Sequence, residues 1–291
     1  MYEYIDQGHS FDVIYLDFAK AFDKVPHARL SSVLQAHGVA GEAVKWINNW
    51  LEERQQRVVS NREKSEWLPV TSGVPQGSVI GPILFVIFIN LLDRITDQLT
   101  MILSKFADDM KAGRVVNCEN DRDLQQNVID ILLKWSEEWL IVFNASKCKV
   151  IHFGKNNPKY SYTMGGFASG GTVLESSKEE KYIGVIISDS LKPSQCAVAA
   201  RKANQVLGQM SRSFHYRDRF TWIKLYKVYV RPHHEYAVQA WSPWTQEDIN
   251  LLENVQRRAL RMTSGLAGQT YEERLNEVGL TSLEPGDFVV I

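Results

Sequence analysis

Short apolar runs interrupt the first two thirds of the chain and mark candidate strands. Residues 12–18 (DVIYLDF) are mostly β-branched or aromatic and lie between polar residues, which predicts a buried strand that delivers Asp17 at its end. Residues 100–106, 147–153 and 181–188 have the same character and predict further strands. The segment that follows 100–106 can turn at residues 107–108 and return as a hairpin, which would place Asp108 and Asp109 at its tip.

Helical spacing of apolar residues fills the intervals between these runs. Two helices joined by a turn are predicted within 28–55, where apolar residues recur around two glycines. A long helix is predicted over 122–142. Its buried face should carry Leu124, Val128, Ile131, Trp135 and Trp139, at spacings of three and four residues.

After about residue 190 the strand patterns largely stop, and three helices are predicted. The first has Ser194 as its N-cap and a face made of Cys196, Ala200, Ala203, Leu207 and Met210. The second carries Trp222, Leu225 and Tyr229 and should end at Pro232. The third opens at Thr245, stops at Gly265, buries Ile249, Leu252, Val255, Ala259 and Met262, and exposes Arg257, Arg258 and Arg261. An α+β body followed by an all-helical region is therefore expected.

Composition and charge narrow the class of protein. The 291 residues are 44% hydrophobic, enough for a real core, and 33 basic residues nearly balance 34 acidic ones. This balance argues against a uniformly basic nucleic-acid binder. Locally, the segment from Lys192 to Arg231 contains nine basic residues and a single acidic residue, Asp218. That segment could contact phosphates, or it could simply be the solvated faces of helices.

The sequence does not indicate a membrane-spanning protein or a protein stabilised by disulfides. The most apolar run, 79–92, contains Pro82 and Asn90 and falls short of the roughly 20 residues that a bilayer requires, so a buried helix is expected. The first residues lack the basic and apolar regions of a signal peptide. Three widely separated cysteines form neither a disulfide framework nor a zinc pattern, which favours a reducing compartment.

The candidate chemistry lies in three aspartates: Asp17 in YLDFAKAFD, and Asp108 with Asp109 in KFADDMK. Crowded carboxylates repel one another, so such a cluster is expected mainly where divalent cations neutralise it. Two cations held in this way can activate a primer 3′-hydroxyl and stabilise departing pyrophosphate. Asp17 and Asp108 are the predicted metal bridges, with Asp109 adding charge at the rim.

Two further segments fit a nucleotide site. Phe22 stands five residues after Asp17, where its ring could exclude a ribose 2′-hydroxyl; the alternative is an ordinary core aromatic. In the loop VPQGS (74–78), Gly77 allows close backbone approach and Gln76 offers both a donor and an acceptor.

Five segments occur in a fixed order along the chain: YLDFAKAFDKVPH, GVPQGSVIGPILFVIFIN, KFADDMK, FNASKCKVIHFG and YIGV. A helical tail that contains LYKVYVRPHHEYAVQAW and LLENVQRRALR follows them. Together they resemble reverse transcriptases of non-LTR, LINE-type retrotransposons, especially those of Jockey-like elements. The resemblance covers nearly the whole chain. It implies an α+β fold: a right-hand polymerase palm, with an antiparallel sheet packed on helices, at 1–189, a helical thumb at 190–270 and a short tail at 271–291.

The resemblance also implies site roles, matched by position. Asp17, Asp108 and Asp109, with the Phe18 carbonyl nearby, would hold two Mg²⁺ ions. Lys147 would aid pyrophosphate departure, Phe22 would exclude ribonucleotides, and Gln76 with Gly77 would lie beside nucleotide and template. Tyr182, Ile183 and Gly184 match the primer-grip hairpin. The implied partners are an RNA template, a DNA primer and dNTPs, and the implied location is the nucleus.

Departures from the family pattern leave a second hypothesis open. Relatives carry a fingers region and an endonuclease domain before the YLDF segment, whereas eleven residues precede Asp12, so we expect the fingers to be missing. Without template and triphosphate contacts, a metal site has no positioned substrate. The alternative is a non-catalytic remnant or co-opted protein that binds nucleic acid or another protein.

Overall fold

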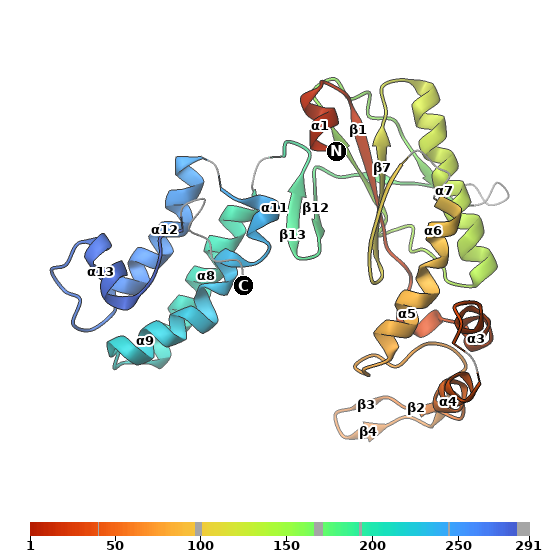
Figure 1. Cartoon of the computed structure of the whole chain (residues 1–291), viewed down its shortest axis with the longest axis horizontal. Helices are drawn as coiled ribbons and strands as arrows, with labels where there is room; N and C mark the ends of the chain where they lie inside the picture. The colour runs from red at the N-terminus through yellow and green to blue at the C-terminus, as the bar shows by residue number, and fades with distance from the viewer. Residues whose placement is uncertain (40, 97–100, 166–170, 192–193, 244, 284–291) are drawn as a thin grey trace. The chain divides into compact units, whose positions relative to one another are not determined.

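The first apolar run forms strand β1 (Phe11–Leu16), and every residue of this strand is buried. The protein is described here by a computed structural model over residues 1–39, 41–96, 101–165, 171–191, 194–243 and 245–283. It divides into two compact units, Met1–Lys178 and Glu179–Ile291 (Figure 1). The predicted boundary between palm and thumb, after residue 189, stays a prediction.

Strand β1 is the middle strand of a five-stranded sheet in the first unit, with the order β11-β8-β1-β7-β6. Its two neighbours, β7 (Asp109–Val115) and β8 (Lys149–Phe153), run antiparallel to it. The edge strands are β6 (Ile102–Phe106), antiparallel to β7, and β11 (Glu175–Ser176), parallel to β8. The strands predicted at 100–106 and 147–153 are thus present, although residue 100 lies outside the described residues.

Helices in the first unit follow the predicted pattern. The helix–turn–helix expected within 28–55 is formed by two helices of ten residues each, and most of the apolar run at 79–92 is helical, divided between two helices at Asn90. In its described residues the first unit has the helices α1 (Tyr2–Asp6), α2 (Ala21–Lys24), α3 (His27–Ala36), α4 (Glu42–Leu51), α5 (Gly81–Ile89), α6 (Leu91–Thr96) and α7 (Glu119–Trp139).

Three short antiparallel pairs complete the first unit. They are β2 (Gln55–Gln56) with β5 (Leu68–Pro69), β3 (Val59–Ser60) with β4 (Glu63–Lys64), and β9 (Thr163–Met164) with β10 (Thr172–Val173). The first two pairs are fully exposed and form a ribbon beside α4 (Figure 1).

One face of the sheet and the helices that cover it share a single apolar core. Ile14 and Leu16 of β1 pack with Phe85 and Phe88 of α5 and with Trp135 of α7. Helices α6 and α7 run along the sheet, with α3 and α5 below them (Figure 1). The predicted face of α7 was partly wrong. Val128 and Trp135 are buried as predicted and Ile131 and Trp139 are partly buried, but Leu124 is 41% exposed. The helix also buries Gln125, Ile129, Leu132 and Ser136.

The second unit begins with a hairpin and continues as helices. Residues 181–188, predicted as one strand, instead span the hairpin of β12 (Glu179–Tyr182) and β13 (Val185–Ser188). The helical elements that follow are α8 (Ser194–Ser213), α9 (Arg219–Leu225), the π-helix η1 (Tyr226–Val230), α10 (Pro232–Glu235), α11 (Val238–Trp241), α12 (Gln246–Arg261) and α13 (Tyr271–Val278).

Two of the three predicted helices have the expected faces. All five residues predicted on the buried face of α8 are buried. The Thr245 side chain accepts a hydrogen bond from the Asp248 amide and caps α12, which buries four of its five predicted positions and leaves Met262 partly buried.

The second predicted helix ends where expected, because the π-helix η1 stops at Val230 and Pro232 opens a separate helix, α10. Its predicted face was partly wrong, since Tyr229 is 56% exposed. The π-helical turn shifts the register, because one extra residue per turn rotates the later side chains, so Tyr226 and Val230 are buried instead. Across the described ranges, no helix combines the length and apolarity needed to cross a bilayer.

Candidate metal and nucleotide site

The topology of the sheet brings the three aspartates to one end of neighbouring strands. Asp17 follows the last residue of β1, and Leu16 pairs with Met110 in β7. The β6–β7 hairpin turns at residues 107–108, where Ala107 has a φ of 53°, and Asp109 is the first residue of β7, opposite Phe106. The predicted hairpin with both aspartates at its tip is therefore confirmed as a local structure.

Asp108 and Asp17 are close enough to Asp109 for their charges to act on its carboxyl. Burial raises the pKa of the Asp109 carboxyl, and the negative charges of Asp108 and Asp17 raise it further. Within the described part of the chain, no three His, Cys, Asp or Glu side chains meet the geometry of a metal site. Three carboxylates nevertheless supply the oxygen donors that Mg²⁺ prefers, and a cation would relieve the repulsion that raises this pKa.

Residues near the start of β8 hold Asp17 in place. The Lys147 ammonium lies 3.4 Å from Asp17 Oδ1, so it neutralises part of the local charge. The Asn144 amide donates to the Asp17 carbonyl at 2.8 Å. The Asp17 amide lies 3.4 Å from Cys148 Sγ, and burial raises the pKa of this thiol to about 11. Sequence reasoning found Lys147 but missed Asn144 and Cys148.

The Phe18 side chain is buried rather than open to a substrate. Its ring stacks on Phe143 with centroids 4.4 Å apart, and the two residues form an isolated antiparallel bridge. The bonds of this bridge are made by the flanking residues, Ala19 with Val142 and Asn144 with Asp17. The Phe18 carbonyl, predicted to lie near a metal, is therefore not used in the bridge.

Phe22 has features of both interpretations, a core aromatic and a ring that borders a nucleotide. Its ring stacks on Phe85 of α5 at 4.5 Å, as a core aromatic would, but it is only partly buried. The Phe22 carbonyl accepts a hydrogen bond from the Val74 amide at 2.8 Å, which attaches this turn to the loop that carries Gln76. Gln76 is exposed, and Gly77 has a φ of 80°, a conformation that favours glycine.

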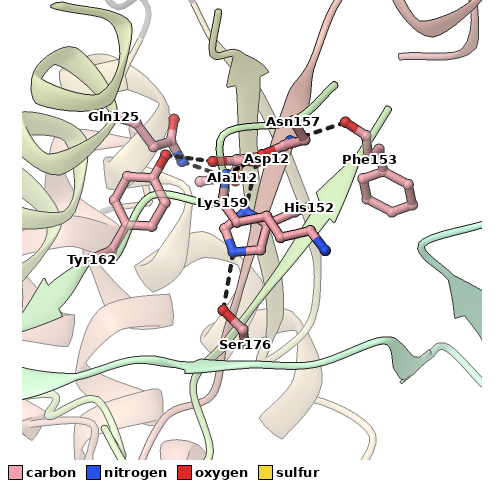
Figure 2. A network of polar contacts seen from close by, with 9 residues as sticks. All are labelled: Asp12, Ala112, Gln125, His152, Phe153, Asn157, Lys159, Tyr162 and Ser176. Atoms are coloured by element: carbon pink, nitrogen blue, oxygen red, sulfur yellow. Dashed lines mark hydrogen bonds and ion pairs between the residues drawn. The ribbon is translucent and has the colours of Figure 1, made fainter. Parts of the chain in front are cut away.

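A buried polar network, missed by sequence reasoning, ties β1 to β8 and to the segment after it (Figure 2). Asp12 is fully buried. Its Oδ1 lies 2.8 Å from His152 Nδ1 and accepts from Asn157 Nδ2 at 2.8 Å, and its Oδ2 accepts from the Tyr162 hydroxyl at 2.6 Å. His152 Nε2 lies 3.0 Å from Ser176 Oγ. The one signal in the sequence was an acid inside an apolar strand, since a buried carboxylate needs partners.

Tyr182, Ile183 and Gly184 lie together at the β12–β13 turn, in the second unit. Ile183 and Gly184 both have positive φ, 46° and 76°, as a two-residue type I′ turn requires. The Tyr236 hydroxyl donates to the Ile183 carbonyl at 3.0 Å. A Cβ at position 184 would approach the Tyr236 ring to 3.0 Å, so this tyrosine supports the turn.

Much of the basic segment at 192–231 is engaged inside the second unit. Arg231 is buried and pairs with Glu235, and Arg219 pairs with Glu277. Arg217 donates to the Ser211 carbonyl at 2.8 Å. These contacts favour a structural role for the three arginines. Arg201, Lys202 and Arg212 remain exposed, and Lys192 lies outside the described residues.

Comparison with known proteins identifies the family. The family model described as reverse transcriptase (RNA-dependent DNA polymerase) matches residues 6–187, which is more than half of the chain. The chain belongs to the reverse transcriptase family. The matched residues include the three aspartates, Lys147 and the Gln76 loop.

The relatives confirm the predicted branch of this family. The chain is 26% identical to the RNA-directed DNA polymerase from mobile element jockey of Drosophila funebris, over 86% of this chain and 28% of that protein. It is 25% identical to the probable RNA-directed DNA polymerase from transposon BS of Drosophila melanogaster, over 88% of this chain and 29% of that protein. The chain thus spans less than a third of the length of these relatives.

A telomerase from Candida albicans, solved with a fragment of telomeric RNA, aligns with 96% of this chain and 52% of its own at 12% identity, with a TM-score of 0.49. That score is too low to support a conclusion about the fold.

Proposed function

We propose that this chain forms the palm and thumb of an RNA-directed DNA polymerase of a LINE-type retrotransposon, acting on an RNA template, a DNA primer and dNTPs in the nucleus. The observation that carries the proposal is the convergence of Asp17, Asp108 and Asp109 at one end of β1 and β7, inside the matched family region. The non-catalytic alternative is not favoured, because all three carboxylates are retained.

The protein residues would divide the work of nucleotidyl transfer. Asp17 and Asp108 would hold two Mg²⁺ ions, with Asp109 at the rim and the Phe18 carbonyl nearby. When bound, such ions activate the primer hydroxyl and stabilise the charge on pyrophosphate. Lys147, already beside Asp17, would donate a hydrogen bond or a proton to the departing pyrophosphate oxygen.

Substrate positioning would fall to residues around this centre. Phe22 would place the edge of its ring against the sugar and exclude a 2′-hydroxyl, while Phe85 holds that ring from behind. Gln76 and Gly77 would lie beside the nucleotide and template. Tyr182, Ile183 and Gly184 would grip the primer, supported by Tyr236.

The test is Mg²⁺-dependent incorporation of labelled dTTP on poly(rA)/oligo(dT) by the purified chain. Asp108→Asn should abolish incorporation, since it removes a charge that the ions require. Asp130→Asn, the same change at an exposed position of α7, is the matched control and should retain it. Equal incorporation by wild type and Asp108→Asn, or none by the wild type, would refute the proposal.

A further inference from the structure

A polar cavity of about 560 Å³ opens in the first unit, on the side of the Gln76 loop. Its walls come from α2 with the residue before it, from the base of the exposed ribbon and from the loop at 69–76. Three basic side chains, Lys20, Lys24 and Arg54, line it, against the single carboxylate of Asp23. The cavity therefore has an excess of positive charge, although the chain as a whole has a net charge of −1.

Close backbone contacts fix the cavity walls. Gly73 donates its amide to the Val25 carbonyl at 2.8 Å, and a Cβ on Gly73 would lie 2.7 Å from Asp23 Cα. The Ser72 hydroxyl donates to the Asp23 carbonyl at 2.8 Å. The Arg54 carbonyl accepts from the Val70 amide at 2.8 Å. Because most of these contacts are between backbone atoms, the cavity is pre-formed.

Arg54 lacks the partners that a partly buried guanidinium needs. Its NH2 group makes one long contact, 3.4 Å, to the Gly73 carbonyl, and its buried Nε has no hydrogen-bond partner. That carbonyl already contacts His27 Nε2 at 2.9 Å. Burial lowers the pKa of Arg54, as expected for a guanidinium that is partly desolvated. Among the described residues, no carboxylate forms an ion pair with Arg54, Lys20 or Lys24.

An anion with several acceptor oxygens would satisfy the free donors of Arg54. Guanidinium and ammonium groups together bind phosphate, the former through paired donors and the latter as a point charge. The cavity also lies near the candidate catalytic residues along the chain, since Lys20 follows Asp17 by three residues and Gln76 is part of its lining. A phosphate bound here would belong to the substrate of that site.

We infer that Lys20, Lys24 and Arg54 form a phosphate-binding site for the nucleic-acid strand or the nucleotide on which the polymerase acts. The inference rests on the proposed function for the identity of its ligand. Phosphate contacts of this kind would orient the ligand without reading its bases.

The experiment measures binding without catalysis, in the Asp108→Asn background. Labelled oligo(rA) and tripolyphosphate are the two probes, titrated at several salt concentrations. Arg54→Gln and Lys24→Gln should each weaken the affinity for one probe by about tenfold. For the oligonucleotide, the slope of the logarithm of the binding constant against the logarithm of the salt concentration should decrease in magnitude by about 0.7 for each lost contact. Loss of oligo(rA) affinity identifies a strand phosphate, whereas loss of tripolyphosphate affinity identifies a nucleotide.

Controls separate this result from misfolding and from the polymerase proposal. Lys45→Gln, at an exposed lysine of α4 paired only with Glu42, should leave both affinities unchanged. Arg54→Lys should recover part of the lost affinity, and thermal melting should be similar for every variant. Unchanged affinity for both probes in Arg54→Gln and Lys24→Gln would overturn the inference. Incorporation activity does not enter the measurement, so either proposal can fail alone.

Discussion

Asp109 is a residue whose ionisation opposes folding in the absence of a cation. Because its folded-state pKa is raised by burial and by Asp108 and Asp17, the folded protein binds the proton more tightly than the unfolded chain does. Stability therefore increases as the pH falls through the raised pKa, and the ionised form is destabilising at neutral pH. Asp109→Asn should raise the free energy of unfolding at pH 7, by about 1 kcal/mol or less because the group is exposed to solvent.

Thermal melting at two pH values and with Mg²⁺ checks this prediction. The gain from Asp109→Asn should disappear at a pH where the carboxyl is protonated in both states. Mg²⁺ should raise the melting temperature of the wild type at pH 7 and raise that of Asp109→Asn less, since one donor is lost. A substitution that destabilises the protein equally at both pH values would contradict the charge argument.

Phe22 has two interpretations that a single substitution separates. If its ring excludes a 2′-hydroxyl, Phe22→Val should lower the discrimination between dTTP and UTP by about tenfold, equivalent to about 1.4 kcal/mol. If the ring is only core, the variant should lose stability with no change in discrimination. Phe85→Val is the matched control, because it removes the other half of the same stack away from the sugar. The ratio of incorporation rates for the two nucleotides is the measurement.

At the scale of elements, the sequence correctly predicted the helices whose pattern depends on local spacing. The buried face of α8 and the Thr245 cap of α12 follow from a helical period and a side-chain bond within one turn. Predictions failed where tertiary packing changed the local rule. The π-helical turn before Pro232 rotates the later side chains, and in α7 Gln125 is buried because its side chain donates to the Ala112 carbonyl of β7 at 3.3 Å.

The apolar pattern of 181–188 predicted a single strand because the turn lacks the usual signal, whereas the family resemblance implied a hairpin at Tyr182, Ile183 and Gly184. The favoured residues for two successive positive φ angles are Asn-Gly, whereas this turn has Ile183-Gly184 with φ of 46° and 76°. A β-branched residue in that conformation is strained by about 1–3 kcal/mol. Such strain suits a residue whose side chain makes a functional contact, since the turn itself does not favour isoleucine.

Ile183→Asn should therefore stabilise the hairpin while it impairs function. The expected gain is about 1 kcal/mol in the free energy of unfolding, because asparagine tolerates positive φ, together with a loss of primer extension if Ile183 touches the primer. Gly184→Ala should be destabilising, since its Cβ would meet Tyr236 at 3.0 Å. Urea titration and an extension assay give the two readouts. A less stable Ile183→Asn protein would contradict the strain argument.

At the scale of the whole molecule, the site depends on pairing between distant segments. The sequence showed an acid at a strand end and an acid pair at a hairpin tip, and these local features are correct. It could not show that Cys148 and Asn144 bond to the Asp17 backbone, because that contact follows from the register of β1 on β8. The Asp12 network and the cavity around Arg54 are hidden in the same way.

The two units have separate cores, so they should unfold separately. The first buries Phe85, Phe88 and Trp135 with residues up to 174, and the second buries Trp222 and Leu252 with residues from 185 onward. None of the described residues belongs to both clusters. Trp222→Ala should therefore destabilise the second unit by about 3–5 kcal/mol and leave the first unchanged. Trp135→Ala, at an equally buried tryptophan of α7, should do the reverse.

Hydrogen exchange followed by mass spectrometry of peptides from each unit can separate the two effects within the intact chain. For Trp222→Ala, slow-exchanging amides of α8 and α12 should become fast while those of β1 and β8 stay protected, because opening of one core leaves the other closed. Faster exchange in both units would mean that the two cores unfold together. In that case the second unit could not be treated as an independently stable thumb.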